Sequence, residues 1–306
     1  MSWLLLAVIG HLVNGVAFVI DTILLRTAFS RSATYAGLVG LLSSLVIFAV
    51  PFVNRWPQGM AWILALIGGA TFVLALWAFF GALARAEASR VVPIVGSLIP
   101  ILTLAGAFAF LGERLSDRMF IGFGFLILAT VILSSRGKGR PAPDAVWLSV
   151  TSAFLFAISS VTVKFTYDAA GFLSGFVTSR IAAAAMALIL LALVDRRAGK
   201  EALTIAFPSK RTSSKHKQPG KLASILTISG QLLGAIGFLF VQWAIAKGSA
   251  SIVNALQAVQ YMLLVLAGFA LHRRAPHLLG ENVTRKALLL KAAALIIAGV
   301  GLYLIV

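Results

Sequence analysis

Long apolar stretches separated by short polar turns run along the whole chain. A helix that crosses a bilayer needs about 20 mostly apolar residues, and no stretch shows the alternation of apolar and polar residues that marks a membrane β-strand. The pattern predicts an all-α integral membrane protein. Ten transmembrane helices are expected, at residues 3–25, 33–53, 61–83, 89–111, 119–135, 145–166, 172–194, 222–245, 250–271 and 287–306.

The second half of the sequence repeats the first. The stretch GGATFVLALWAFFGALARA, which starts at Gly68, aligns with SGQLLGAIGFLFVQWAIAK, which starts at Ser229. Five helices per copy is an odd number, so two tandem copies enter the membrane in opposite directions, as in many transporters. We therefore expect two inverted five-helix repeats, residues 1–140 and 141–306, with a basic loop at residues 195–221 in the second.

Composition narrows the class of protein. Of 306 residues, 60% are hydrophobic and 11% are charged, whereas soluble proteins carry about 25% charged residues. The net charge of +17 does not indicate a nucleic-acid partner, because the basic residues lie in turns between apolar stretches. The chain has no cysteine, so a disulfide or a thiolate site is excluded. We expect no metal or other cofactor.

The basic residues predict an orientation. The odd-numbered loops between the predicted helices, with the helix ends beside them, hold 19 Lys and Arg residues, and the even-numbered loops with their helix ends hold 5. Basic loops stay in the cytoplasm, so the odd-numbered loops are predicted to be cytoplasmic and both termini to lie outside. We expect a multi-pass protein of the cell (inner) membrane.

Polar side chains inside a membrane are costly and are therefore functional candidates. In the first predicted helix, His11, Asn14 and Asp21 fall within about 80° of one another around the axis. They form a polar stripe on which the Asp21 carboxylate is a candidate binding group for a proton or a cation. The alternative is that Asp21 lies near the membrane surface and pairs with Arg26 or Lys164.

Two further cations interrupt apolar stretches. Lys164 in the sixth predicted helix has two open interpretations, a buried ion pair with the first helix or a side chain that reaches the membrane surface. Arg180 in the seventh either reaches the surface or faces a central cavity. In the cavity it would hold an anionic group of a substrate, such as a carboxylate or a phosphate.

Uncharged polar residues mark the ninth predicted helix. Asn254, Gln257 and Tyr261 share one helical face, and amides and a phenol suit a polar substrate. The alternative is interhelical hydrogen bonding, worth about 0.6 kcal/mol per contact. The fourth helix has Ser97 between two prolines, Pro93 and Pro100, which we expect to bend it and free backbone carbonyls.

The third and eighth helices add Trp77, near mid-span, and Gln231. The predicted substrate and ion pathway consists of Asn14, Asp21, Trp77, Ser97, Lys164, Arg180, Gln231, Asn254, Gln257 and Tyr261.

The stretch ASRVVPIVGSLIPILTLAGAFAFLGERLS, residues 88–116, resembles the drug/metabolite transporter superfamily in its ten-helix EamA-like branch. Gly112, Glu113, Arg114 and Leu115 match the Gly-Glu-Arg-Leu turn of that family. The resemblance implies two inverted five-helix repeats around a central cavity and movement of small metabolites, amino acids or drugs, often as proton-coupled efflux. It also implies cytoplasmic termini, in conflict with the charge distribution.

These observations predict a secondary transporter that moves a small molecule by alternating access, with the proton as candidate coupling ion, as a monomer or a homodimer. A non-transporting membrane scaffold or regulatory subunit is the alternative. An enzyme is not expected. The chain has no GxxxxGK[ST] motif and no HExxH motif, and His216, His272 and His277 lie in predicted loops.

Overall fold

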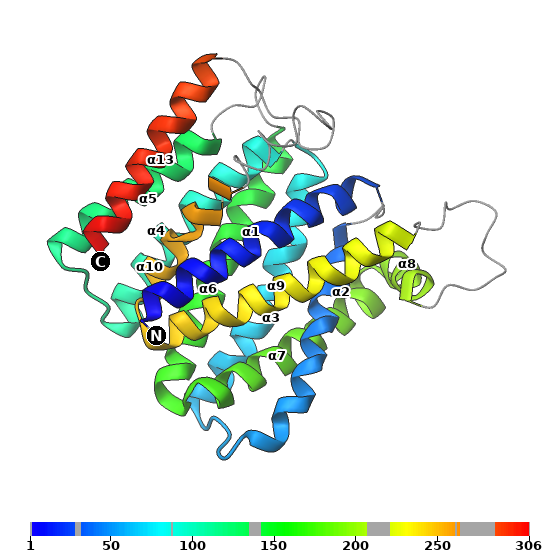
Figure 1. Ribbon diagram of the computed structural model, residues 1–306. Coiled ribbons are helices and arrows are strands. Elements are labelled where there is room, and N and C mark those ends of the chain that lie inside the picture. Colours follow the sequence, from blue (N-terminus) through cyan, green and yellow to red (C-terminus); the bar gives the residue numbers. More distant parts are fainter. Residues whose placement is uncertain are drawn as a thin grey trace.

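The computed structural model describes residues 2–27, 32–86, 88–134, 142–206, 221–260, 262–263 and 285–305 (Figure 1). These residues contain helices and no β-strand, in agreement with the all-α prediction. The helices are α1 (Trp3–Thr27), α2 (Ser32–Leu42), α3 (Met60–Leu83), α4 (Ala88–Leu111), α5 (Asp117–Ser134), α6 (Pro143–Ala170), α7 (Phe172–Ile189), α8 (Arg196–Ala206), α9 (Lys221–Lys247), α10 (Ala250–Ala255) and α13 (Arg285–Ile305).

Two of these helices change type before they end. α2 continues as the 3-10 helix η1 (Ser43–Phe52), and α7 continues as the π-helical turn η2 (Leu190–Val194). Within the described residues, seven helical segments are long and apolar enough to cross a membrane, and a shorter apolar helix covers Ala292–Ile305. Each of the ten predicted ranges contains helix, but ten membrane crossings stay a prediction.

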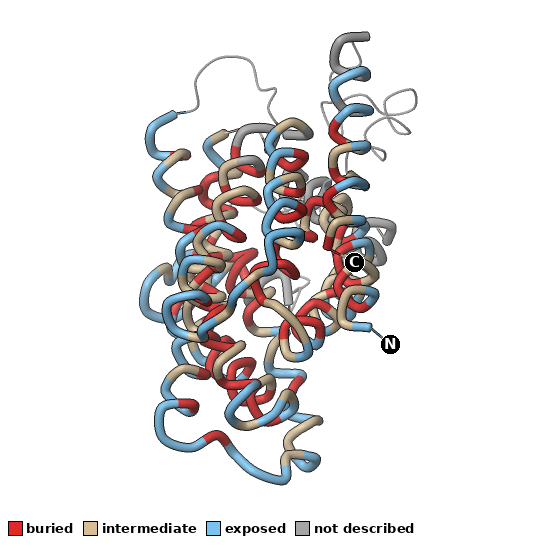
Figure 2. Tube along the Cα trace, turned by 90° about the vertical axis from the view of Figure 1, so that its left-hand side faces the viewer, coloured by how far each residue is buried: buried red, intermediate tan, exposed pale blue. Residues whose placement is uncertain are grey.

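The outward faces of the helices are apolar. Phe48, Phe110 and Trp147 are 75%, 79% and 72% exposed, and buried residues line the faces that meet other helices (Figure 2). Large apolar side chains exposed on so many helices would aggregate in water. Their distribution is that of a helix bundle whose outer surface faces lipid.

Helices from the two halves of the chain pack on one another. α3 lies against α6 and α7, α1 lies against α9, and α5 lies against α13. Glycines permit the closest of these approaches. A Cβ atom at Gly69 would collide with the carbonyl oxygen of Ser179 and lie 2.8 Å from Cβ of Ala182. A Cβ atom at Gly237 would lie 2.5 Å from Oδ1 of Asn14.

The α3–α6 and α1–α9 interfaces use corresponding positions of the repeated sequence. Gly68 of α3 faces Thr162 of α6: a Cβ atom added to the glycine would lie 2.8 Å from Oγ1 of Thr162. Gly230 of α9 faces Ile20 of α1, at 2.7 Å. When the two repeats are aligned, Gly230 corresponds to Gly69, next to Gly68, and Ile20 corresponds to Thr162. Equivalent contacts therefore join each half to the other.

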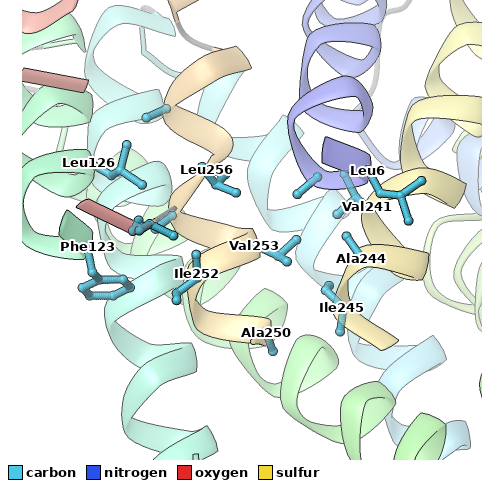
Figure 3. Close-up of a cluster of buried hydrophobic side chains, with 14 of the residues drawn as sticks. Leu6, Phe123, Leu126, Val241, Ala244, Ile245, Ala250, Ile252, Val253 and Leu256 are labelled. Carbon is cyan, nitrogen blue, oxygen red and sulfur yellow. The ribbon is translucent and has the colours of Figure 1, made fainter. Parts of the chain in front are cut away.

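The largest buried apolar cluster joins α1, α5, α9 and α10 (Figure 3). It includes Leu6, Leu126, Val241, Ile252 and Leu256, each at most 8% exposed. The short helix α10 is thus packed between helices of both halves, which positions the polar residues that follow and precede it.

The even-numbered loops meet at one end of the bundle. The Ser174 hydroxyl donates to the carbonyl oxygen of Arg55, and the Ser249 hydroxyl donates to Oε1 of Glu113 at 2.6 Å. The Trp3 ring lies against Gly248, so α1 also begins at this end. Figure 1 shows both termini on this side. We call it the termini end.

A short helix, α8, occupies residues 196–206 of the predicted loop 195–221. At the start of α8, the Asp195 carboxylate accepts a hydrogen bond from the Ala198 N–H at 2.9 Å. The Thr34 hydroxyl donates to Oε2 of Glu201 at 2.6 Å, so α8 is attached to α2. Residues 207–220 of the loop lie outside the described residues.

We predict that Gly69→Ala destabilises the protein by about 1–3 kcal/mol, because the new methyl group would overpack the α3–α7 contact. The midpoint of thermal unfolding in detergent measures the change. Gly124→Ala is the matched control, since a Cβ at this α5 position meets nothing within 4 Å. Equal effects of the two substitutions would contradict the close α3–α7 approach.

The native chain has no cysteine, so single introduced cysteines report its orientation. Gln58→Cys lies in the loop before α3 at the termini end, and Arg197→Cys lies in α8. From the charge distribution we expect an impermeant maleimide to label the Gln58 variant in intact cells and the Arg197 variant only after permeabilisation. The reverse pattern would place both termini in the cytoplasm.

Candidate functional site

Arg180 of α7 is held among three aromatic rings. Its guanidinium carbon lies 4.4 Å from the ring centroid of Phe72 on α3, 4.6 Å from that of Phe238 on α9 and 5.9 Å from that of Phe176 on α7. The residue is 5% exposed. We call Arg180 and these three rings the Arg180 cage. The side chain is buried and does not reach the membrane surface.

The cage lies near the middle of the bundle. Arg180 is eight residues from Phe172, the first residue of α7 at the termini end, which corresponds to about 12 Å of helix. Phe238 is nine residues before Lys247, where α9 ends at the same end, or about 14 Å. Because the hydrocarbon core is about 30 Å thick, this depth corresponds to the membrane midplane.

No carboxylate compensates this charge within the described part of the chain. The Arg180 Nε is buried without a hydrogen-bond partner, and the residue has no ion pair there. The described acidic side chains lie at or near helix ends or in the short helix α8, away from this depth: Glu113, Asp117, Asp144, Asp168, Asp195 and Glu201. Cation–π contacts, worth about 2 kcal/mol or more when desolvated, offset part of the burial cost.

A second polar group lies where α10 meets α4 and α6. The Asn254 amide nitrogen donates to Oγ1 of Thr103 and to Oγ of Ser160, both at 3.0 Å. Asn254 and Thr103 are 8% and 0% exposed. Sequence reasoning selected Asn254 but not Thr103, because a single threonine in a 24-residue apolar helix carries no distinguishing pattern.

The predicted ninth helix is interrupted beside this group. α10 ends at Ala255, Leu256 forms a turn, and the Val259 N–H donates to the carbonyl oxygen of Leu256 at 2.9 Å. The face predicted to join Asn254, Gln257 and Tyr261 assumed a continuous helix and stays a prediction. Gln257 is half-buried beyond the turn, and Tyr261 lies outside the described residues. By contrast, α4 runs unbroken through Pro93 and Pro100.

The predicted stripe on the first helix lies on α1. His11 is buried and its Nε2 donates to the carbonyl oxygen of Val253 at 2.8 Å, which links α1 to α10. Asn14 lies against Gly237 of α9. Asp21 belongs to α1, but its side chain lies outside the described part of the structure.

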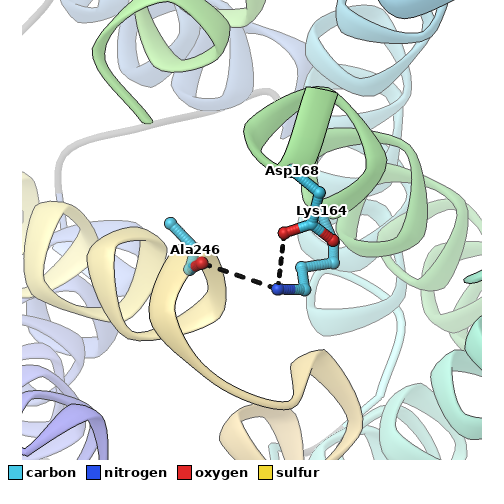
Figure 4. Close-up of polar contacts among 3 residues, drawn as sticks. All are labelled: Lys164, Asp168 and Ala246. Carbon is cyan, nitrogen blue, oxygen red and sulfur yellow. Dashed lines mark hydrogen bonds and ion pairs between the residues drawn. The ribbon is translucent and has the colours of Figure 1, made fainter. Parts of the chain in front are cut away.

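Lys164 pairs with its own helix. Its Nζ lies 2.8 Å from Oδ1 of Asp168 and donates to the carbonyl oxygen of Ala246 on α9 at 3.5 Å (Figure 4). A pair with Asp21 is not compatible with the fold, because Lys164 is at the termini end and Asp21 lies 18 residues, about 27 Å, along α1 from Trp3.

Two more contacts join α6 and α7 to the end of α9. The Tyr167 hydroxyl donates to Oε1 of Gln242 at 2.9 Å. The Phe172 and Trp243 rings stack with centroids 6.0 Å apart and an interplanar angle of 12°. We call these contacts, together with that of Lys164 and Ala246, the end seal. Its residues lie closer to the termini end than the Arg180 cage does.

The remaining candidates lie elsewhere. Trp77 packs against the buried cluster around Tyr35, and the Gln231 amide donates to the Tyr35 hydroxyl at 3.0 Å. Ser97 is half-buried on α4. The structure thus distributes the sequence-predicted residues over several interfaces and leaves Arg180 and Asn254 as the buried polar groups at the centre of helix contacts.

The helical fold and the buried polar side chains are those of a multi-pass membrane protein. Residues 1–135 match the model of the EamA-like transporter family, within the drug/metabolite transporter superfamily, so the resemblance noted in the sequence is confirmed over that stretch. Members of this family are transporters and not enzymes. The match covers residues 1–135 of the 306-residue chain.

A solved structure titled "Crystal structure of protein" is similar over nearly the whole length. The TM-score is 0.63 at 18% sequence identity, with 98% of this chain and 97% of that chain covered. At this identity the likeness concerns the fold alone. Among curated proteins, none matches the chain.

We predict that Asn254→Ala lowers the free energy of unfolding by about 1 kcal/mol, since two interhelical hydrogen bonds of about 0.6 kcal/mol are lost. Thermal unfolding in detergent measures the loss. Ser251→Ala is the control one turn earlier, because the Ser251 hydroxyl is buried without a partner. A control that loses as much stability would show that burial, not hydrogen bonding, explains the effect.

Proposed function

We propose that the protein is a secondary transporter that moves a small organic molecule across the cell membrane by alternating access. The match of residues 1–135 to the EamA-like transporter family carries this proposal. The fold likeness over 98% of the chain supports extending it to the second half. In this proposal residues 1–140 and 141–306 are two inverted five-helix repeats.

The packing of the two halves suits alternating access. The glycine contacts of α1 with α9 and of α3 with α6 occupy corresponding positions of the repeats. The same motion is therefore available at both ends of the bundle, in opposite directions. The end seal blocks one end with a few polar and aromatic contacts. Opening it while the opposite end closes would expose the interior to the other side of the membrane.

The interruption at Leu256 supports a substrate site beside it. In transporters, discontinuous helices surround the site near the midplane, since the break frees backbone groups for ligands. Asn254 precedes this break and Gln257 follows it. We propose that these amides and Arg180 belong to the substrate pathway and that Asn14, Asp21, Trp77, Ser97, Lys164, Gln231 and Tyr261 contribute to the pathway or its motion.

Uptake of radiolabelled solutes into proteoliposomes that contain the purified protein tests the function. Transport requires saturable flux of at least one small metabolite, amino acid or drug, and acceleration of that flux by the same solute on the opposite side. Flux equal to that of empty liposomes for every class would favour the non-transporting scaffold or regulatory subunit.

Asp21 is our candidate for the residue that binds the coupling proton. It is the acidic residue of the predicted polar stripe on α1. We predict that Asp21→Asn abolishes accumulation driven by a pH gradient while exchange of the solute across the membrane continues, because exchange moves no net proton. Asp144→Asn, at the start of α6, is the control. Undiminished pH-driven accumulation in the Asp21 variant would exclude this role.

A further inference from the structure

We infer that Arg180 binds the carboxylate of a monoanionic substrate whose apolar part contacts the rings of Phe72, Phe176 and Phe238. This inference deepens the proposed transport function and rests on it. It assigns the chemical class of the solute, which neither the family nor the fold likeness provides.

The first argument is charge. The Arg180 side chain is only 5% exposed and lies at about mid-membrane depth. An unpaired ion in a low-dielectric interior is costly, and the described carboxylates lie near helix ends or in α8. A charged residue is retained at such a position when it interacts with something that moves through the protein. The missing partner is an anion.

The second argument is the unused hydrogen-bonding capacity of the guanidinium. Rings at 4.4 and 4.6 Å contribute cation–π attraction but no hydrogen-bond acceptor of the oxygen type. Arginine has five N–H donors in a rigid planar fork that matches a carboxylate with two parallel bonds. Of these donors, the Nε–H is buried and has no hydrogen-bond partner within the described residues.

The third argument concerns the net charge of the solute, which we expect to be −1. A carboxylate neutralises Arg180 and leaves a pair with no net charge, whereas a phosphate dianion or a dicarboxylate leaves an uncompensated negative charge among aromatic rings. Such a charge is strongly disfavoured in an apolar interior. Phosphate sites also need several donors, and the surroundings of this arginine are phenyl rings.

The fourth argument gives the solute an apolar body. Phe72 contacts Phe156 of α6 at 6.0 Å and Phe238 at 5.0 Å between ring centroids, so aromatic surface extends beyond the cage across α3, α6 and α9. A benzoate-like or medium-chain carboxylate would pair its charged head with Arg180 and its apolar part with these rings.

Thermal unfolding of the purified full-length protein, titrated with defined probes, tests the inference. A ligand that binds only the folded state raises its stability in proportion to RT ln(1 + [L]/Kd). We expect benzoate and hexanoate to bind at least about 10-fold more tightly than benzamide and hexanamide, as expected when a charge-assisted hydrogen bond is lost. Succinate and inorganic phosphate are expected to bind more weakly than benzoate.

Two variants and one control complete the test. Arg180→Gln should abolish the preference for benzoate over benzamide, and Arg180→Lys, which keeps the charge, should retain part of it. Arg85→Gln should leave the preference unchanged, because Arg85 Nη1 donates to the Gly81 carbonyl at the opposite end of α3. If Arg180→Gln does not fold, the comparison of carboxylate and amide on the native protein and on Arg180→Lys still decides.

Equal binding of benzoate and benzamide to the native protein would overturn the inference, as would tighter binding of phosphate or a carboxylate preference that survives in Arg180→Gln. Its failure is distinguishable from failure of the proposed function. Saturable flux of a neutral or cationic solute without carboxylate binding would reject only the inference. Selective, Arg180-dependent carboxylate binding without flux of any solute would reject only transport.

Discussion

The close approach of helices from opposite halves is the constraint on which this structure depends. In lipid, helices gain little from burying apolar side chains, because lipid tails are equally apolar, so association relies on tight packing around small residues. Gly69 on α3 and Gly237 on α9 provide such contacts, each with a helix of the other half. Neither half completes its own interior. The buried polar groups use partners from the other half: Asn254 of α10 donates to Thr103 of α4, and Arg180 of α7 lies over Phe72 of α3.

The apolar pattern predicted the helices because span length is dictated by bilayer thickness. It did not predict where helices change type or stop. The turn at Leu256 has no glycine or proline beside it, whereas α4 continues through two prolines. Packing of Ile252 and Leu256 into the largest buried cluster, a tertiary effect, accompanies that turn. The short helix α8 depends on contacts with α2 that are equally invisible in a local pattern.

The candidate site was partly predictable for a related reason. A charge or an amide within an apolar stretch stands out, so Arg180 and Asn254 were selected from sequence. Their partners were not, because the chain has 21 phenylalanines and nothing in sequence distinguishes the three around Arg180. The pairing of Lys164 with Asp21 failed because an alignment compares positions along the chain and not depth in the bundle. Lys164 lies at the termini end and pairs with Asp168, whereas Asp21 lies about 27 Å along α1 from that end.

Strong and weak contacts are separated in this molecule in a way that permits motion. The glycine contacts involve backbone and small side chains and leave little room for rearrangement within each helix pair. The end seal contains one hydrogen bond, one ring stack and one long lysine–carbonyl contact. At about 1 kcal/mol or less per contact, opening it costs about 2–3 kcal/mol, which lies in the range that separates interconverting conformations of a protein. Differential binding of a ligand to two conformations supplies free energy of this size. In the proposed transport cycle, pairing of Arg180 with an incoming solute would therefore be sufficient to shift the balance.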